Sequence, residues 1–435
     1  MTKTLHIRGG RPLSGRVRVA GAKNAASKMM VASLLTDEEV TLDNCPQIEE
    51  ISITSEICAA IGAHVRREGS RIVIQTPKIV STKVAKMTRA NRISILAIAP
   101  LLHRSGEAEV PRVGGDAIGP RPVDFHLQAL IQMGAVIEEA EGSYKARAPK
   151  GGLRGATIVL PYPSIGATET IILAGVLASG RTRIENAAVE PEIVDIVKFL
   201  QQMGAIIEFG ANRTLTIDGV KRLHGVSYEV IPDRLEAASF ANLAIATGGE
   251  IIVEGARQSE LVTFLNTIKR IGGDFEVTPE WIRFRRGNGG LVGIELETDT
   301  YPGFATDWQQ PTVVTLTQAK GISVVHETVY EDRFGYTEDL RRMGADIGVF
   351  AKCLGELPCR FRNRSQRHSA VIMGATPLHG AAVEIPDIRA GMAQVIAALV
   401  ADGETTLTGI HHLERGYENL WDKLKALGAD FEIRS

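Results

Sequence analysis

QQMGAII, residues 201–207, joins the end of an apolar-periodic stretch to a run typical of a β-strand. A glycine at such a junction supplies the left-handed residue that ends a helix, and the small residue after it lets the chain turn directly into a strand. The same pattern recurs in AAIGAHV, IQMGAVI, KRIGGDF, RRMGADI and KALGADF. The six junction glycines are Gly62, Gly134, Gly204, Gly272, Gly344 and Gly428.

The spacing of these glycines defines a repeating unit. By subtraction, successive glycines lie 72, 70, 68, 72 and 84 residues apart. A turn and a run of alternating β-branched residues precede each helix, as in DEEVTLDN (37–44) and GRTRIENA (180–187), and such alternation predicts a half-buried strand. Solenoid repeats span only ~20–50 residues. We therefore expect an α/β (α+β) fold in which a small module occurs six times, three modules in each of two similar lobes.

Composition limits the classes of function. At 435 residues the chain exceeds the ~250–300 residues at which a single core stops growing. A formal net charge of -2 provides no overall field for nucleic acid or an anionic membrane. The N-terminus lacks the apolar core of a signal peptide, and no run of about 18 apolar residues occurs. We expect a cytoplasmic protein with small-molecule partners.

The cysteines and histidines match no standard metal pattern. Cys45, Cys58, Cys353 and Cys359 have neither metal-ligand nor disulfide spacing, so we interpret them as free thiols. His411 and His412 lack a third ligand at zinc spacing. No metal site and no cofactor is expected.

The longest repeat interval contains a basic insertion. Its extra residues lie near CLGELPCRFRNRSQRHSA (353–370), which carries Arg360, Arg362, Arg364 and Arg367. This cluster is either an anion site or a loop whose charges face water.

Several loops combine charged residues with turns. Lys23 and Asn24 follow a Gly-Ala turn where a helix begins, so Lys23 is either part of an anion pocket or a surface lysine. In VPRVGGDAIGPRPVD (110–124), Asp116 lies between glycine-rich turns and Arg121 follows. That loop is either a mobile lid that delivers a proton or a hairpin with a solvated aspartate.

Further acids stand near predicted helix starts. Asp307 follows the YPGF turn among bulky apolar residues, and is either a general base or the cap of the next helix. Asp387 with Arg389 and Glu414 with Arg415 are either functional pairs or structural salt bridges. No GxSxG, HExxH, GxGxxG or CxxC motif occurs.

Together these motifs resemble the UDP-N-acetylglucosamine 1-carboxyvinyltransferase family of enolpyruvyl transferases. The resemblance runs from about residue 5 to the C-terminus. It rests on GAKNAA, GGxAIGxRPVD, PSxGATE, ENAAxEPEIVD, IPDRxEA, YPGFxTD, DIRAG and LERGYE.

The resemblance implies a domain organisation. One lobe of three βαβαββ-type units would span 22–231 and carry a mobile loop at 110–122, and the other would combine 1–21 with 232–435. Each lobe would have three-fold pseudo-symmetry, described as an inside-out α/β barrel, with the active site in the cleft between the lobes.

The resemblance also implies a reaction without a metal or organic cofactor. The 3′-hydroxyl of UDP-N-acetylglucosamine attacks phosphoenolpyruvate as its methylene carbon is protonated, and the adduct then expels phosphate. This is the first committed step of peptidoglycan precursor synthesis.

Residue roles follow from the matched motifs. Asp307 is the expected base, with Asp387 and Arg389 in a supporting network. Arg333 is a further substrate-binding residue, and Asn24 contacts the sugar. Phosphoenolpyruvate is held by Lys23, Arg92, Arg121 and Arg415. The uridine diphosphate site is lined by Arg121, Pro122, Val123, Asp124, Ser164, Ile165 and Gly166.

Asp116 departs from the family pattern. Most members have a cysteine at this position, which fosfomycin alkylates. A partly protonated carboxylic acid can donate the same proton but offers no thiolate. We therefore expect Asp116 to be catalytic and the protein to resist fosfomycin.

Three other functions stay open. The sister enzyme acting on shikimate 3-phosphate has GSKS and GNAGTAxR motifs that this chain lacks. A paralogue acting on another nucleotide sugar and a non-catalytic UDP-sugar-binding regulator are the remaining alternatives. A monomer or weak oligomer is expected.

Overall fold

The computed structural model describes residues 3–84, 92–112 and 123–434. The described chain divides into two compact units. The central unit comprises residues 21–231, and the terminal unit comprises 3–20 with 232–434. Each unit has its own hydrophobic core, so the burial of apolar side chains stabilises each of them separately.

The central unit contains three sheets. Their strand orders are β13-β3-β5-β4, β6-β8-β7 and β11-β12-β10-β9. The strands are β3 (Val40–Asp43), β4 (His64–Glu68), β5 (Arg71–Gln75), β6 (Glu107–Pro111), β7 (Val136–Ala140), β8 (Ser143–Arg147), β9 (Thr157–Val159), β10 (Arg181–Glu185), β11 (Ile206–Gly210), β12 (Thr214–Asp218) and β13 (Ser227–Glu229). The helices are α1 (Lys23–Ala32), η1 (Ser33–Leu35), α2 (Glu49–Ile61), η2 (Ile93–Ala97), α3 (Ile98–Ser105), α4 (Asp124–Gln132), α5 (Ile165–Gly175) and α6 (Pro191–Gln202).

The terminal unit contains three further sheets. Their strand orders are β15-β16-β14-β2, β17-β18-β20-β19 and β21-β22-β1-β23. The strands are β1 (Thr4–Arg8), β2 (Ser14–Arg18), β14 (Glu250–Glu254), β15 (Gly273–Val277), β16 (Trp281–Arg286), β17 (Glu295–Glu297), β18 (Gly321–His326), β19 (Asp346–Phe350), β20 (Ser369–Gly374), β21 (Ala382–Glu384), β22 (Glu404–Thr408) and β23 (Asp430–Arg434). The helices are α7 (Arg234–Thr247), α8 (Gln258–Ile271), α9 (Thr306–Thr317), α10 (Thr337–Arg342), α11 (Ile388–Val400), α12 (His411–Glu414) and α13 (Leu420–Ala426).

The predicted repeat is confirmed in both units. All six junction glycines adopt positive φ, between 91° and 128°, the region in which glycine is favoured. Five of the six sheets have one parallel edge pair followed by two antiparallel pairs, and in the sheet of β6 the parallel position is held by a single bridge from Lys83 to Glu109. The order β9-α5-β10-α6-β11-β12 is a complete βαβαββ unit.

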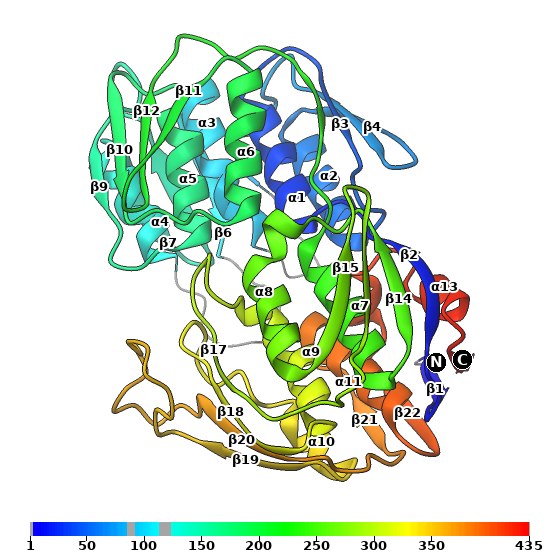
Figure 1. Cartoon of the computed structure of the whole chain (residues 1–435). Coiled ribbons are helices and arrows are strands. Elements are labelled where there is room, and N and C mark those ends of the chain that lie inside the picture. Colours follow the sequence, from blue (N-terminus) through cyan, green and yellow to red (C-terminus); the bar gives the residue numbers. More distant parts are fainter. Residues whose placement is uncertain (1–2, 85–91, 113–122, 435) are drawn as a thin grey trace. The chain divides into compact units, whose positions relative to one another are not determined.

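In the terminal unit, helices α7, α9 and α11 lie inside, with the sheets around them (Figure 1). Helices α7, α9 and α11 pack against one another and are almost fully buried. Burial on all sides explains why their polar residues, such as Asn242 and Thr315, are hydrogen-bonded to one another inside the unit. The sheets remain open within the described residues, and none closes into a barrel.

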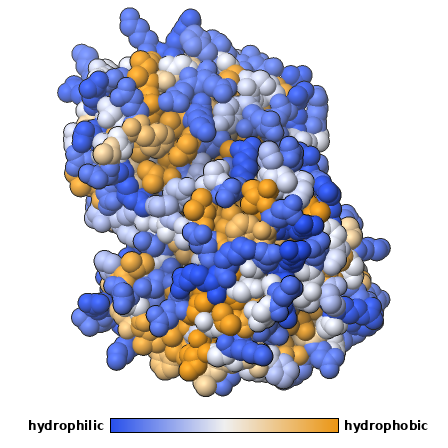
Figure 2. Space-filling model, in the orientation of Figure 1, coloured by the Kyte–Doolittle hydropathy of each residue, from blue (hydrophilic) through white to orange (hydrophobic). Residues whose placement is uncertain are grey.

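The outer faces are mixed in character. On the face drawn in Figure 2, hydrophilic side chains surround smaller apolar groups. Exposed apolar side chains include Val159 and Ile322, which lie on or at the ends of strands, and exposed apolar residues are normal for folded proteins. Among the described residues, no helix has both the length and the apolar character needed to cross a bilayer.

Candidate active site

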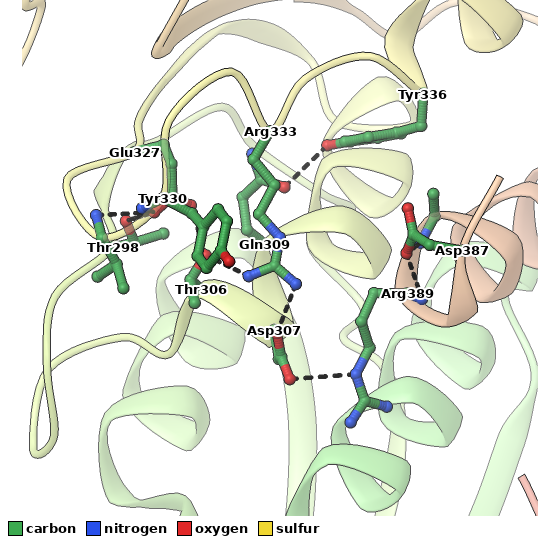
Figure 3. Close-up of polar contacts among 12 residues, drawn as sticks. Thr298, Thr306, Asp307, Gln309, Glu327, Tyr330, Arg333, Tyr336, Asp387 and Arg389 are labelled. Carbon is green, nitrogen blue, oxygen red and sulfur yellow. Dashed lines mark hydrogen bonds and ion pairs between the residues drawn. The ribbon is translucent and has the colours of Figure 1, made fainter. Parts of the chain in front are cut away.

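In the terminal unit, Asp307 lies on the first turn of α9. The helix cap is Ala305, and no side-chain cap is formed there, so the interpretation of Asp307 as the helix cap is wrong. Its carboxylate points toward two arginines (Figure 3). Oδ1 accepts from Nη2 of Arg333 at 2.5 Å, and Oδ2 accepts from Nε of Arg389 at 3.2 Å.

Both arginines are buried while the carboxylate stays partly open. The side chains of Arg333 and Arg389 are 7% and 9% exposed, against 26% for Asp307. Burial by itself lowers the pKa of Arg333, but the charges of Asp307 and Glu327 outweigh it and the pKa is raised. The pKa of Arg389 is also raised, because Tyr417 and Asp307 outweigh the effect of burial. Both groups are therefore permanent cations, and they place two positive charges against the Asp307 carboxylate.

Glu327 fixes the loop that carries Arg333. Its Oε1 accepts from Oγ1 of Thr298 at 2.8 Å and from the backbone N–H groups of Val329 and Tyr330, each at 2.9 Å. Thr306 donates to Oε2 of Glu327 at 2.9 Å and accepts from Nη1 of Arg333 at 2.7 Å. A carboxylate that receives several hydrogen bonds holds its donors in one geometry.

Asp387 and Arg389 do not form the salt bridge that their proximity suggested. Asp387 is the N-cap of α11, where its carboxylate accepts from the backbone N–H groups of Arg389 and Ala390 at 2.8 and 3.0 Å. The Arg389 side chain donates to Tyr417 at 3.1 Å and reaches Asp307 with its Nε. The cap fixes the start of α11 and so sets the position of Arg389.

Arg415 follows α12, which packs against α11. The neighbouring Glu414 accepts from Nε1 of Trp421 at 3.1 Å. Two residues beyond Arg415, the buried Tyr417 contacts both Arg389 and Ser239. The LERGYE segment thus contributes directly to the network around Asp307.

In the central unit, the starts of α4 and α5 lie together. Ser164 caps α5 by accepting from the N–H of Ala167 at 3.3 Å. A Cβ at Gly166 would come within 2.8 Å of Cε1 of His126, in the first turn of α4. Val123 and Asp124 begin α4, and so lie beside Ser164, Ile165 and Gly166. Two helix N-termini at one place favour an anion.

Arg92 adds a cation near the same helix starts. It precedes η2, and its charge together with burial lowers the pKa of His126 to about 3, burial being the larger cause. His126 is therefore neutral near pH 7, and its Nδ1 lies 2.8 Å from Oγ1 of Thr170. Arg92, Asp124 and Gly166 therefore lie close together around His126.

Lys23 and Asn24 occupy the first turn of α1, which has no side-chain cap. Helix α1 packs against η2, the element that Arg92 precedes. Three predicted site residues, Asp116, Arg121 and Pro122, lie outside the described residues.

The structure adds residues that the sequence patterns did not single out. Thr306, Glu327 and Tyr417 hold the cations of the Asp307 network. Thr306 and Tyr417 lie inside the YPGFxTD and LERGYE motifs, so those motifs could have identified them as site residues. Glu327 has no such signal, because it lies outside the quoted motifs and its side-chain partners, Thr298 and Thr306, are distant in the sequence.

The whole chain matches known enolpyruvyl transferases. The family model described as EPSP synthase (3-phosphoshikimate 1-carboxyvinyltransferase) matches residues 7–424. The solved structure of the enolpyruvyl transferase NikO from Streptomyces tendae has a TM-score of 0.87 and 25% identity, and covers 99% of both chains. EPSP synthase from Acinetobacter baumannii, at 18% identity and a TM-score of 0.72, shares the fold. The chain belongs to the enolpyruvyl transferase family and is an enolpyruvyl (1-carboxyvinyl) transferase.

Three relatives that share one more specific name are similar to nearly the whole chain. UDP-N-acetylglucosamine 1-carboxyvinyltransferase of Protochlamydia amoebophila is 50% identical over 437 aligned residues, which cover 99% of this chain and 94% of that protein. The protein of the same name from Chlamydia pneumoniae is 47% identical and covers 97% of this chain. The one from Zymomonas mobilis is 43% identical and covers 98%.

Proposed function

We propose that the protein transfers the enolpyruvyl group of phosphoenolpyruvate to the 3′-hydroxyl of UDP-N-acetylglucosamine and releases phosphate. The names of relatives that match nearly the full chain support this acceptor. The observation that carries the proposal is the partly open Asp307 carboxylate between two buried arginines, at the position where the resemblance expects the group that meets the sugar hydroxyl. The product would serve peptidoglycan precursor synthesis.

Asp307 is the acceptor for the attacking hydroxyl in this proposal. Its ionised carboxylate receives a hydrogen bond from the 3′-hydroxyl, and takes the proton as the oxygen bonds to C2 of phosphoenolpyruvate. The two guanidinium groups hold the carboxylate in one position, so that it orients the hydroxyl as well as taking its proton. Asp387 acts by positioning Arg389.

Cations bind the highly charged donor substrate. Lys23, Arg92, Arg121 and Arg415 neutralise the phosphate and carboxylate of phosphoenolpyruvate, with Arg side chains able to form paired hydrogen bonds to each group. As the adduct collapses, the Asp116 carboxylate left by the addition takes a proton back from C3, the C2–C3 double bond re-forms and the C2–O bond to phosphate breaks. The same cations stabilise the leaving phosphate.

The paired helix starts of the central unit supply the nucleotide site. Ser164, Ile165 and Gly166 on α5 adjoin Val123 and Asp124 on α4. With Arg121 and Pro122 they line the uridine diphosphate, and Asn24 contacts the sugar. Free backbone N–H groups at helix starts favour a diphosphate.

Asp116 donates the proton to the methylene carbon C3 during addition. A carboxylic acid can do this only while it is partly protonated at the assay pH. Because the residue has no sulfur, fosfomycin has no thiolate to alkylate. The drug should therefore leave the enzyme active.

The test is phosphate release from phosphoenolpyruvate and UDP-N-acetylglucosamine, with and without fosfomycin, in three proteins. The unmodified enzyme should release phosphate in both conditions. Asp116→Asn should lose about 100-fold or more, the usual contribution of a general acid. Asp116→Cys is the matched control, and should be active but inactivated by the drug.

Other outcomes identify the alternatives. Phosphate release only with a different nucleotide sugar would favour a paralogue with another acceptor. UDP-N-acetylglucosamine binding without turnover by folded protein would favour a regulator. Fosfomycin inactivation of the unmodified enzyme would contradict the role given to Asp116.

A further inference from the structure

A cluster of two cysteines and two histidines lies in the terminal unit, apart from the Asp307 network. The potential ligand atoms of His326, Cys353, Cys359 and His368 all lie within 4.8 Å of one another. His326 is the last residue of β18, and His368 immediately precedes β20. These strands pair with His326 opposite Ser369, so the sheet brings the two imidazoles together. The cysteines come from the insertion between β19 and β20.

One nitrogen in this cluster has no hydrogen-bond partner in the described chain. His326 is fully buried, and its Nε2 is unpaired. A buried polar atom without a partner costs free energy on the order of 1–3 kcal/mol. Its other nitrogen, Nδ1, lies 2.8 Å from Oε2 of Glu297, and must donate there because a carboxylate only accepts. Nε2 of His326 therefore presents a lone pair to the cluster.

The second histidine is held in the same way. Nδ1 of His368 lies 2.7 Å from the backbone oxygen of Gln366, so it too must carry the proton. Its Nε2 lies 3.3 Å from Sγ of Cys353. An imidazole whose far N–H is fixed by a carboxylate or a carbonyl is the usual arrangement of a metal-ligating histidine.

We propose that these four side chains form a tetrahedral Cys₂His₂ site for zinc. With Zn–S near 2.3 Å and Zn–N near 2.0–2.1 Å, neighbouring sulfur and nitrogen ligands of a tetrahedron lie about 3.5 Å apart. The observed 3.3 Å between Cys353 and His368 fits that edge. Two thiolates and two imidazoles suit Zn²⁺ and exclude the hard cations Mg²⁺ and Ca²⁺. Four protein ligands leave no open position, so the site is structural.

The residues around the four ligands hold the insertion close to His326. A Cβ at Gly355 would lie 2.1 Å from Oε2 of Glu297 and 2.3 Å from Nδ1 of His326, so only glycine allows the insertion to pass so close. The backbone N–H groups of Glu356 and Leu357 donate to Glu297 at 2.9 and 3.0 Å. Glu297 thus orients a ligand and also ties down the insertion.

A metal would supply stability that this insertion lacks. Within 351–367, Phe361 is the one large apolar side chain that is fully buried. A segment with so little apolar burial needs another source of order, and metal binding provides it. The four ligands are not themselves part of the Asp307 network, but the chain connects the two, because Glu327 directly follows His326.

The test begins with the metal content of the full-length protein, purified without chelators from zinc-supplied cells. About one zinc ion per chain is expected. Cys353→Ser/Cys359→Ser should reduce this more than ten-fold. Cys45→Ser/Cys58→Ser is the matched control, because both thiols are buried in the other unit, and it should keep its zinc.

A second measurement does not depend on variants. Cobalt added to metal-depleted full-length protein should give the visible absorption of a tetrahedral site with sulfur-to-cobalt charge transfer, and zinc should abolish it. A metal-free protein that binds neither ion would overturn the proposal. Zinc that persists in the double cysteine variant would also overturn it, as would a Cys353–Cys359 disulfide in protein purified under reducing conditions.

Discussion

At the scale of single residues, the central feature is a carboxylate held by two buried cations. Sequence motifs were sufficient to select Asp307, Asp387 and Arg389 as candidates. They did not predict which groups pair, because Asp307 lies 26 residues from Arg333 and 82 from Arg389. Local spacing favoured a helix cap at Asp307 and a salt bridge at Asp387, and both interpretations failed for that reason.

Replacing Asp307 tests its part in the reaction. Asp307→Asn keeps the shape but removes the charge that we propose accepts the hydroxyl proton. We expect kcat for phosphate release to fall by about 10²–10⁴-fold, with a smaller change in KM for phosphoenolpyruvate. The measurement is steady-state phosphate release over a range of both substrates.

A surface carboxylate provides the control for this change. Asp346→Asn alters an exposed side chain on β19 and should leave kcat unchanged. If Asp307→Asn retained full kcat, the carboxylate would have no role in the chemical steps.

Glu169 makes the stability of the central unit depend on pH. It is buried, and burial raises its pKa to about 7, an effect increased by Glu192 and Glu190 and opposed by Lys28 and Arg92. The folded state therefore binds more protons than the unfolded state between pH 4.5 and 7. This contribution is fully present below pH 4.5 and is lost as pH rises through 7.

Glu169→Gln removes that dependence by mimicking the protonated form. The free energy of unfolding of the variant minus that of the unmodified protein should be larger at pH 8 than at pH 4, by on the order of 3 kcal/mol. Denaturant unfolding at the two pH values measures the difference, with exposed Glu138→Gln as control. An equal effect of Glu169→Gln at both pH values would contradict the assignment.

At the scale of elements, the junction glycines and the strands after the helices were predictable because both signals are local. No local signal predicted the contact between α4 and α5, since it depends on Gly166 meeting a histidine 40 residues earlier, and only the resemblance had placed residues 121–124 and 164–166 at one site. The Cys₂His₂ cluster was missed for a related reason. Its cysteines match no standard spacing, and His326 comes from a different strand.

Gly166→Ala tests the close approach of α4 and α5. The added methyl would lie within 2.8 Å of the buried His126 ring, and such overpacking costs about 1–3 kcal/mol. We expect a loss of stability in that range and weaker binding of UDP-N-acetylglucosamine by calorimetry, because the helix starts would separate.

Gly289→Ala is the control for the loss of a glycine. A Cβ there would meet nothing within 4 Å, and the residue does not have a positive φ. Its nucleotide affinity and stability should match those of the unmodified protein. If Gly166→Ala bound UDP-N-acetylglucosamine with unchanged affinity, the starts of α4 and α5 would not be part of the nucleotide site.

At the scale of the whole molecule, the chain begins in the unit where it ends. Strand β1 lies between β22 and β23, and β2 pairs with β14. Periodicity predicted the repeats but not this closure, because no local pattern shows which sheet an N-terminal strand joins. Only the resemblance placed residues 1–21 with the C-terminal part, and the structure divides the chain within one residue of that boundary.

The pairing of β1 and β2 with strands of the C-terminal part predicts which fragments of the chain fold alone. Residues 21–231 should fold alone, because they contain all strands of their three sheets. Residues 232–435 should not fold cooperatively, because the sheet of β22 and β23 would lose its interior strand. Circular dichroism and denaturant unfolding distinguish the two outcomes.

A rejoined fragment provides the control. Because Thr4 lies opposite Arg434, a short linker from residue 435 to residues 1–20 should restore folding of the terminal unit. Cooperative unfolding of 232–435 without those residues would contradict the role of β1 and β2.

The most direct measurement is the mass spectrum of the nucleotide sugar after incubation with the protein and phosphoenolpyruvate. Enolpyruvyl transfer predicts that UDP-N-acetylglucosamine gains one enolpyruvyl group, with one phosphate released for each product molecule formed. If the folded protein leaves both substrates unchanged, UDP-N-acetylglucosamine is not its acceptor and the proposed function is wrong.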